Sequence, residues 1–195
     1  MAKQLRAALT AFILLSLITG VLYPLLMTGI GQVFFPYQAN GSLIVQDGQV
    51  VGSALIGQTT DDPAYFWWRP SAVNAMQGSS ADALTASGAT NYGWTNATLA
   101  DQVVERAAAI RAAHNLPQDA PIPSDLLFAS ASGLDPHISP EAAELQIDRV
   151  AQARGLERAQ VESLTTQYTE APQFGILGQP RVNVLLLNLA LDSIE

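Results

Sequence analysis

The chain of 195 residues has no cysteine, one lysine and two histidines. Without cysteine it can form neither a disulfide framework nor a thiolate metal site. His114 and His137 are 23 positions apart with no ligand spacing, which favours capping or solvated roles over a metal site. The lysine, Lys3, stands near the N-terminus, so no phosphate-binding Gly-x-x-x-x-Gly-Lys-Ser/Thr loop is present. Thiol, zinc and P-loop chemistry are therefore not expected.

Charge is also missing from one long stretch, since no charged residue occurs between Ala7 and Gln46. Its first part, residues 7–30, is long enough for a helix to cross a hydrocarbon core of about 30 Å at about 1.5 Å per residue. Gly20 and Pro24 would weaken a soluble helix, but membrane spans tolerate them where a neighbour satisfies the freed carbonyl. We expect one transmembrane helix that packs against another protein.

A cleaved signal peptide shares the basic start of this segment, but it has a shorter apolar core and a small-residue cleavage site. Here the apolar character continues through Phe34 and Phe35, and no Ala-x-Ala sequence follows the core. The cluster of Phe34, Phe35 and Tyr37 is typical of a membrane interface. We interpret the segment as an uncleaved anchor.

The basic residues predict an orientation, because positive charge beside a span stays cytoplasmic. Lys3 and Arg6 precede the segment, and the next basic residue is Arg69. The part beyond the segment carries seven arginines against 17 acids, which argues against nucleic acid or anionic lipid as partners and is compatible with a cation pathway. The predicted organisation is a cytoplasmic N-terminus at 1–6, a transmembrane helix at 7–30, an interfacial connector at 31–40 and one soluble extracytoplasmic α+β domain at 41–195.

Two local signals describe the start of the outer domain. Asp47-Gly48 suits a tight two-residue turn, so residues 43–46 and 49–53 are predicted to form a β-hairpin. The aromatic run at 64–68 ends at Arg69-Pro70, and proline removes a backbone donor. It predicts a short strand followed by a loop.

Three helices and a last strand are expected further along. Helical periodicity begins near Thr98, with Asp101 completing a capping box, and it ends at Asn115 and Pro117.

Ser139 caps a helix over 140–154 that stops at Gly155, and another helix follows at about 158–168. The apolar run at 182–189 predicts a buried strand, with Asn183 and Asn188 as its polar exceptions. These elements give an α+β class for the outer domain.

Several local sequences are unusual in combination. They are Tyr23-Pro24-Leu25, Gln38-Ala-Asn-Gly-Ser-Leu43, Gly52-Ser-Ala-Leu-Ile-Gly-Gln58, Arg69-Pro-Ser-Ala72, Ser87-Gly-Ala-Thr-Asn-Tyr-Gly-Trp-Thr-Asn96, Ser130-Ala-Ser-Gly-Leu-Asp-Pro-His-Ile-Ser-Pro140, Gly178-Gln-Pro-Arg-Val-Asn183 and Leu187-Asn-Leu-Ala-Leu-Asp192. In this order they resemble the C subunit of the bacterial Kdp potassium-transporting ATPase, over essentially the whole chain. Ala89, Thr90, Tyr92 and Trp94 depart from that family's pattern, so we expect the loop to keep its shape while the contacts of these side chains change.

The resemblance implies a non-catalytic accessory subunit of an ATP-driven, high-affinity potassium import complex in the bacterial cytoplasmic membrane. Its implied partners are the lipid bilayer, a channel-like A subunit, an ATP-hydrolysing B subunit and a small F peptide. This chain lacks the Asp-Lys-Thr-Gly phosphorylation sequence, so hydrolysis would belong to the B subunit. No covalently bound cofactor is expected, and ATP and potassium would act at the level of the complex. The expected contributions are assembly, stability, and potassium uptake or the ATP affinity of the B subunit.

The family residue implicated in ATP affinity matches Gln146, which could hydrogen-bond a base or a ribose. A glutamine on an amphipathic helix more often faces solvent, and an extracytoplasmic Gln146 would face a compartment without ATP. The nucleotide effect would then be indirect, or it would reflect the detached domain. Two alternatives stay open: a nucleotide-binding chaperone that uses Gln146, and a free-standing single-span envelope protein.

Residues of the family blocks are candidates for interfaces, although turn and capping chemistry explains most of them equally well. These candidates are Tyr23, Pro24, Gln58, Arg69, Pro70, Ser71, Asn91, Asn96, Ser132, Gly133, Asp135 and Asn183.

Overall fold

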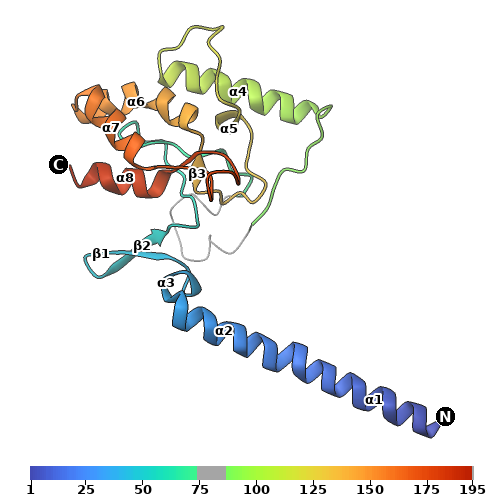
Figure 1. The fold of residues 1–195 in the computed structure, drawn as a ribbon. Helices are drawn as coiled ribbons and strands as arrows, with labels where there is room; N and C mark the ends of the chain where they lie inside the picture. Colours follow the sequence, from blue (N-terminus) through green and yellow to red (C-terminus); the bar gives the residue numbers. More distant parts are fainter. Residues whose placement is uncertain (74–86, 195) are drawn as a thin grey trace. The chain divides into compact units, whose positions relative to one another are not determined.

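The computed structural model describes residues 1–73 and 87–194, which belong to two compact units, Met1–Ser53 and Ala54–Glu195. Residues 74–86 of the predicted outer domain lie outside the described residues. The ribbon is shown in Figure 1.

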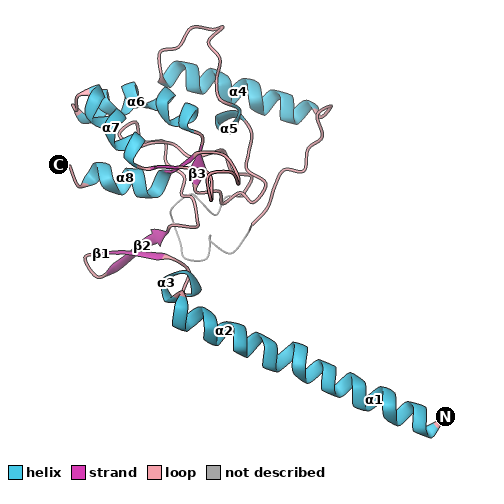
Figure 2. Ribbon diagram, in the orientation of Figure 1, coloured by secondary structure: helices cyan, strands magenta, loops and turns pink. Residues whose placement is uncertain are grey.

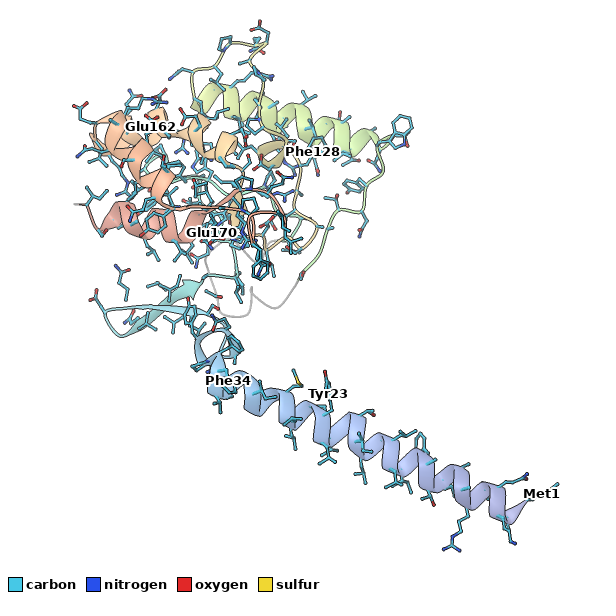
Figure 3. All side chains as sticks on the ribbon, in the orientation of Figure 1. Met1, Tyr23, Phe34, Phe128, Glu162 and Glu170 are labelled. Carbon is cyan, nitrogen blue, oxygen red and sulfur yellow. The ribbon has the colours of Figure 1, made fainter. Side chains whose placement is uncertain are left out.

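The first unit begins with one long helix, Ala2–Phe34. It consists of α1 (Ala2–Leu17), a π-helical turn η1 (Ile18–Leu22) and α2 (Tyr23–Phe34). None of its residues is buried, and the side chains of Tyr23 and Phe34 project from its surface (Figure 3). Its 33 residues would extend for about 50 Å at about 1.5 Å per residue, which exceeds a hydrocarbon core. Its length and apolar composition make it a candidate membrane span.

The π-helical turn ends two residues before Pro24 and has a local cause. The Tyr23 N–H donates to the carbonyl of Ile18, five residues back. Proline has no N–H, and its ring collides with the carbonyl four residues earlier in a regular α-helix. The wider turn relieves this collision, so the helix passes Pro24 without ending.

A short helix α3 (Pro36–Ala39) and a hairpin complete the first unit. Strands β1 (Leu43–Gln46) and β2 (Gln49–Ser53) are antiparallel, with Gln46 opposite Gln49. Asp47 and Gly48 have φ values of 51° and 77°, as a type I′ turn requires. The predicted hairpin is confirmed.

Helices make up most of the regular secondary structure of the second unit, and long loops connect them (Figure 2). They are α4 (Ala97–Ala113), α5 (Ser124–Leu127), α6 (Pro140–Arg154), α7 (Arg158–Gln167) and α8 (Val184–Asp192). An antiparallel sheet has β5 (Arg181–Asn183) between β3 (His137–Ile138) and β4 (Thr169–Glu170). Helix α7 packs against both α6 and α8 (Figure 1). The core lies among these elements, and its largest fully buried apolar side chains are Phe66, Ile147, Val150, Val161, Val182, Val184, Leu187 and Leu191.

Helix ends follow the local signals closely. The Ser139 hydroxyl accepts from the Ala142 N–H at 3.1 Å, and α6 ends at Gly155 with φ 67°, so this prediction is confirmed. Helix α4 starts one residue earlier than Thr98, because the side chain of Asn96 is its cap. Asn96 therefore replaces the capping box that was expected at Thr98 and Asp101.

The buried strand predicted at 182–189 is wrong, because β5 ends at Asn183 and helix α8 follows. The Asn183 side chain accepts from the Leu186 N–H at 3.2 Å, which caps α8, and donates to the Ala54 carbonyl at 2.8 Å. Six of the nine residues of α8 are buried, and the half-buried Leu186 and Leu189 are also apolar, so the run has no polar face whose spacing would show a helical period.

The short strand predicted at 64–68 is also wrong, because these residues, here called the aromatic segment, pair with no other strand. The Phe66 N–H donates to the Asn188 side chain at 2.8 Å, and the Phe66 carbonyl accepts from the same amide at 3.0 Å. A side-chain amide offers the same donor and acceptor as a peptide group. Asn188 on α8 thus replaces a neighbouring strand.

Asn96 and Asn183 provide a matched test of this packing, because both cap a helix but only Asn183 also bonds a distant carbonyl. We expect N96A to lower the free energy of unfolding by about 1 kcal/mol and N183A by about 2 kcal/mol or more. Urea unfolding of the full chain in detergent, followed by tryptophan fluorescence, measures both. Equal losses would show that the Ala54 contact contributes nothing.

Candidate functional site

Gln146 lies on α6 with 0% of its surface exposed, so the expectation that it faces solvent is wrong. Its Oε1 accepts from the Trp67 N–H at 2.7 Å and from Nη2 of Arg149 at 2.8 Å. Its Nε2 donates to the carbonyls of Trp67 at 3.2 Å and Ala142 at 3.1 Å. A primary amide has two donor hydrogens and two acceptor lone pairs. All four are used within the chain.

Arg149, on the next turn of α6, also holds the aromatic segment. Its Nη1 donates to the carbonyls of Pro63 at 2.6 Å and Tyr65 at 3.0 Å, and its guanidinium carbon lies 4.0 Å from the centroid of the Trp67 ring. Burial lowers the pKa of Arg149 to about 10, against the opposing charge of Asp62. The guanidinium therefore stays charged at neutral pH, and carbonyls and an aromatic face replace its hydration. We call Gln146, Arg149 and Asn188 the amide–guanidinium clamp.

His114, which ends α4, also contacts Arg149. Its Nδ1 lies 2.8 Å from the Ile110 carbonyl, so Nδ1 carries the proton and Nε2 accepts from Nε of Arg149 at 3.1 Å. The ring meets Trp67 edge-on, with centroids 5.5 Å apart. Burial lowers the pKa of His114, and the charge on Arg149 lowers it further, against the hydrogen bond to Ile110. The capping role expected for His114 is confirmed.

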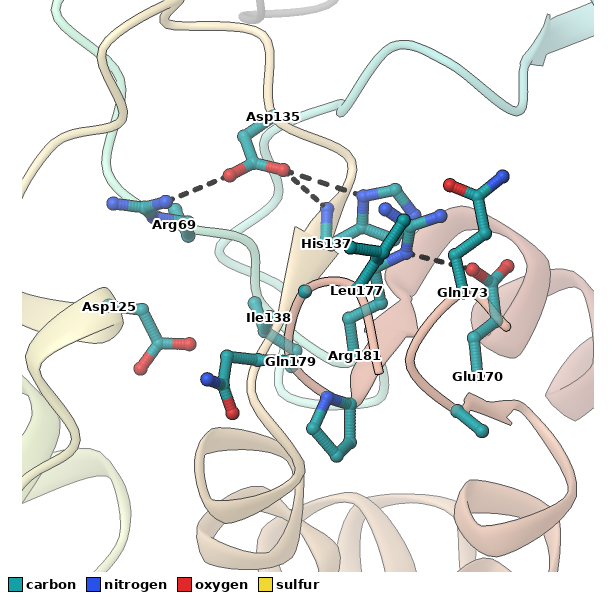
Figure 4. Close-up of a pocket in the computed structure, with 13 residues that line it drawn as sticks. Arg69, Asp125, Asp135, His137, Ile138, Glu170, Gln173, Leu177, Gln179 and Arg181 are labelled. Atoms are coloured by element: carbon teal, nitrogen blue, oxygen red, sulfur yellow. Dashed lines mark hydrogen bonds and ion pairs between the residues drawn. The ribbon is translucent and has the colours of Figure 1, made fainter. Parts of the chain in front are cut away.

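A second cluster joins family blocks that are far apart in the sequence. Asp135 accepts from Nη1 of Arg69 at 2.8 Å and from the His137 N–H at 3.0 Å, and Nδ1 of His137 lies 3.6 Å from the same carboxylate (Figure 4). Burial raises the pKa of Asp135, but the hydrogen bonds from His137 and Arg69 outweigh it and set the pKa at about 2. Asp135 is thus an ionised anchor for the Arg69 segment.

Further hydrogen bonds beside this ion pair join the same two segments. The Ser71 hydroxyl donates to the Gly133 carbonyl at 2.7 Å, and the Ser130 N–H donates to the Pro70 carbonyl at 3.1 Å. Gly133 has φ 70°, and a Cβ there would come within 2.7 Å of the Val73 side chain. Only glycine fits this position without strain.

The Ser132 carbonyl accepts from the Gly88 N–H at 2.8 Å, which adds residues 87–88 to the cluster. The structure therefore brings together six predicted candidates, which we call the motif junction: Arg69, Pro70, Ser71, Ser132, Gly133 and Asp135.

The other candidates lie elsewhere. Asn96 and Asn183 are helix caps, and Asn91 is exposed in the loop before α4 with φ 54°. Gln58 is partly buried near the start of the second unit. Tyr23 and Pro24 belong to the first unit, in α2.

Two cavities adjoin these clusters. A cleft of about 710 Å³ is lined by Arg69, Asp135, His137, Glu170 and Arg181, among others (Figure 4). Nη1 of Arg69 is paired with Asp135, and Nε of Arg181 lies 2.8 Å from Glu170, so both arginines of this cleft already bind a carboxylate. Within residues 1–73 and 87–194, no group of three or more histidine and acidic side chains is placed to hold a metal ion.

The second, smaller cavity of about 220 Å³ is mainly apolar and is lined by Trp67, Trp68, Ile110, His114 and Gln146, among others.

Neither the role of Arg149 nor the partner of Asn188 was expected from the sequence. A signal for Arg149 exists, because it shares a buried helix surface with Gln146 and Val150. A charged residue within such an apolar stripe needs buried partners. Those partners are the carbonyls of Pro63 and Tyr65, more than 80 residues earlier, so spacing along α6 could not reveal them.

Gln146 and Gln152 form a matched pair on α6, since Gln152 is exposed. We expect Q146L to lower the free energy of unfolding by about 2–4 kcal/mol, because it leaves the Trp67 peptide groups and one Arg149 donor buried and unpaired. Q152L should change it by less than about 0.5 kcal/mol. Chemical denaturation of the full chain tests both, and a loss at Gln146 no larger than at Gln152 would contradict the clamp.

Stability should also depend on pH in two steps. In the folded state the pKa of His114 is lowered, so below a pH of about 6.5 His114 takes up a proton more readily in the unfolded chain than in the folded one. The folded state therefore becomes less stable as the pH decreases below this value. Between about pH 4 and 2, Asp135 causes a second fall, since its folded pKa of about 2 is below its unfolded value. Melting temperatures across this range measure both steps. H114Q should weaken the first and D135N the second, and unchanged profiles would refute these assignments.

Comparison with known proteins relates this geometry to a family. A family model described as "K+-transporting ATPase, c chain" matches residues 5–193. The potassium-transporting ATPase KdpC subunit of Dechloromonas aromatica is 53% identical over 195 residues and covers 100% of both chains. The KdpC subunit of Sorangium cellulosum is 53% identical over 194 residues, 99% of each chain. That of Herpetosiphon aurantiacus is 54% identical over 190 residues, 97% of this chain and 96% of its own.

The matched span includes the long helix, the clamp and the motif junction, and it confirms the resemblance inferred from the sequence blocks. The chain therefore belongs to the KdpC family and is an accessory subunit of a potassium-importing ATPase complex.

Proposed function

We propose that residues 7–30 anchor this chain in the bacterial cytoplasmic membrane, with residues 1–6 inside, 31–40 at the outer interface and 41–195 outside. The helix Ala2–Phe34 supports this proposal, because it is long, apolar and without a buried residue. Lys3 and Arg6 at its start favour this orientation, since the next basic residue is Arg69.

The chain would act without catalysing a reaction, in a complex with a channel-like A subunit, an ATP-hydrolysing B subunit and a small F peptide. The observation that carries this proposal is that the Gln146 amide makes all four of its possible hydrogen bonds within the chain. The paired state of Arg69 and Asp135 points in the same direction. Both clusters fix the shape of the second unit, which fits a role in assembly and stability and an influence on potassium uptake.

An effect on the ATP affinity of the B subunit would then be indirect. A change at Gln146 would alter the position of the aromatic segment that it binds, and contacts between subunits would carry this change to the B subunit. The alternative is direct nucleotide contact, for which the apolar cavity beside Trp67 and Gln146 offers a flat aromatic surface. It would require Gln146 to give up a buried hydrogen bond, which costs about 1–3 kcal/mol.

The side of the membrane on which the second unit lies distinguishes the indirect effect from direct nucleotide contact. In cells whose outer membrane has been opened, added protease should degrade the second unit and leave a short fragment that carries an N-terminal epitope tag. Reversing both basic residues, with K3E and R6E together, should increase the protected full-length fraction, because the positive-inside signal is lost.

Full protection of the unmodified chain would overturn the outside location and favour direct ATP contact. The free-standing envelope protein is a further alternative, and purification in mild detergent distinguishes it. A pump subunit should bring down two large membrane proteins, whereas a free-standing protein would be recovered alone.

A further inference from the structure

A tight turn in the second unit, residues 173–177, is built on an uncommon residue. The Gln173 N–H donates to the Leu177 carbonyl at 2.8 Å, and the Leu177 N–H donates back to the Gln173 carbonyl at 2.9 Å. Between them Phe174 and Gly175 have φ values of 55° and 77°. Positive φ at both central residues is the pattern of a type I′ turn. We call this segment the apolar turn.

The hairpin of the first unit has the same pair of positive φ values on ordinary residues, since Asp47 and Gly48 have φ values of 51° and 77°, although its loop is one residue shorter. Asn, Asp and Gly are favoured at the first central position, because the Cβ of other residues crowds the following carbonyl. Phe174 occupies this position in the apolar turn. Its side chain is 84% exposed, so burial within the chain does not compensate for the strain.

Phe174 is accompanied by other exposed apolar side chains. Ile176 is 81% exposed and Leu177 is 55% exposed, and residues 171–180 include no charged residue. Contiguous exposed apolar side chains on a rigid turn mark an interaction surface. The strain at Phe174 indicates that the aromatic side chain is kept for a partner.

Charge decides which kind of partner fits. The chain beyond the long helix has seven arginines against 17 acids, so an anionic bilayer surface or a second copy of this chain would be repelled. A protein socket with an apolar floor and a neutral or basic rim would not be repelled. We propose that the apolar turn inserts into such a socket on a membrane-embedded partner subunit of the potassium import complex, an inference that rests on the proposed function.

Phe174 and Phe128 provide a matched pair for testing this docking. Phe128, labelled in Figure 3, is 42% exposed and has an ordinary φ of −103°. F174N keeps a residue that tolerates positive φ but removes the apolar anchor. In the full-length complex in mild detergent, it should weaken association with the partner subunit by at least about tenfold. F128N should leave association unchanged.

The same variants give a second measurement, because F174N should stabilise the unassembled chain while it weakens binding to the partner subunit. Relief of strain should raise the melting temperature of the unassembled full chain by about 2–4 °C, whereas F128N should not raise it. A photo-reactive phenylalanine analogue at position 174 should cross-link to a partner subunit, and the same analogue at position 128 should not.

Each outcome has a definite meaning. Cross-links from position 174 to lipid alone, or to a second copy of this chain, would overturn the proposal. So would undiminished association of F174N when the unmodified chain brings down its partners, and the proposed function would survive that result. Recovery of the unmodified chain alone would overturn the proposed function and the docking together.

Discussion

Side-chain amides take the place of a neighbouring strand in the second unit, and its packing depends on them. Asn188 pairs with both peptide groups of Phe66, and Gln146 does the same for Trp67. A buried peptide group without a partner costs about as much as a lost hydrogen bond. Phe66 can therefore enter the core only where both amides are in place. Because the amides lie on α6 and α8, the aromatic segment also links these helices.

The predicted site residues are bound to partners within the chain in the same way. Arg149 is buried, yet its donors meet carbonyls, His114 and Gln146 rather than a free anion-binding position. Asp135 is ionised because Arg69 and His137 hold it, and it joins two segments that are distant in sequence. These groups fix shape, which is what an accessory subunit of a larger complex needs from its own chain.

Local chemistry made several elements predictable. The hairpin at Asp47-Gly48 and the start and end of α6 at Ser139 and Gly155 depend on backbone angles and caps within a few residues. The predicted strand at 182–189 failed because only Asn183 and Asn188 are polar in this run, so the sequence shows no period that separates a helix from a strand. Gln146 looked like a surface residue because its partner, Trp67, is 79 positions away.

The sequence alone determined the single apolar helix, its charged start, the hairpin, the ends of most helices and, through its ordered blocks, the family. These depend on composition, on local turn and cap chemistry, or on residue order, and none requires a distant contact. Only the tertiary structure decided that the aromatic segment is held by the amides of Gln146 and Asn188, that Arg149 and His114 lie behind it, and that Arg69 meets Asp135. The reason is physical: a buried polar group is defined by its partner, and here each partner comes from a remote part of the chain.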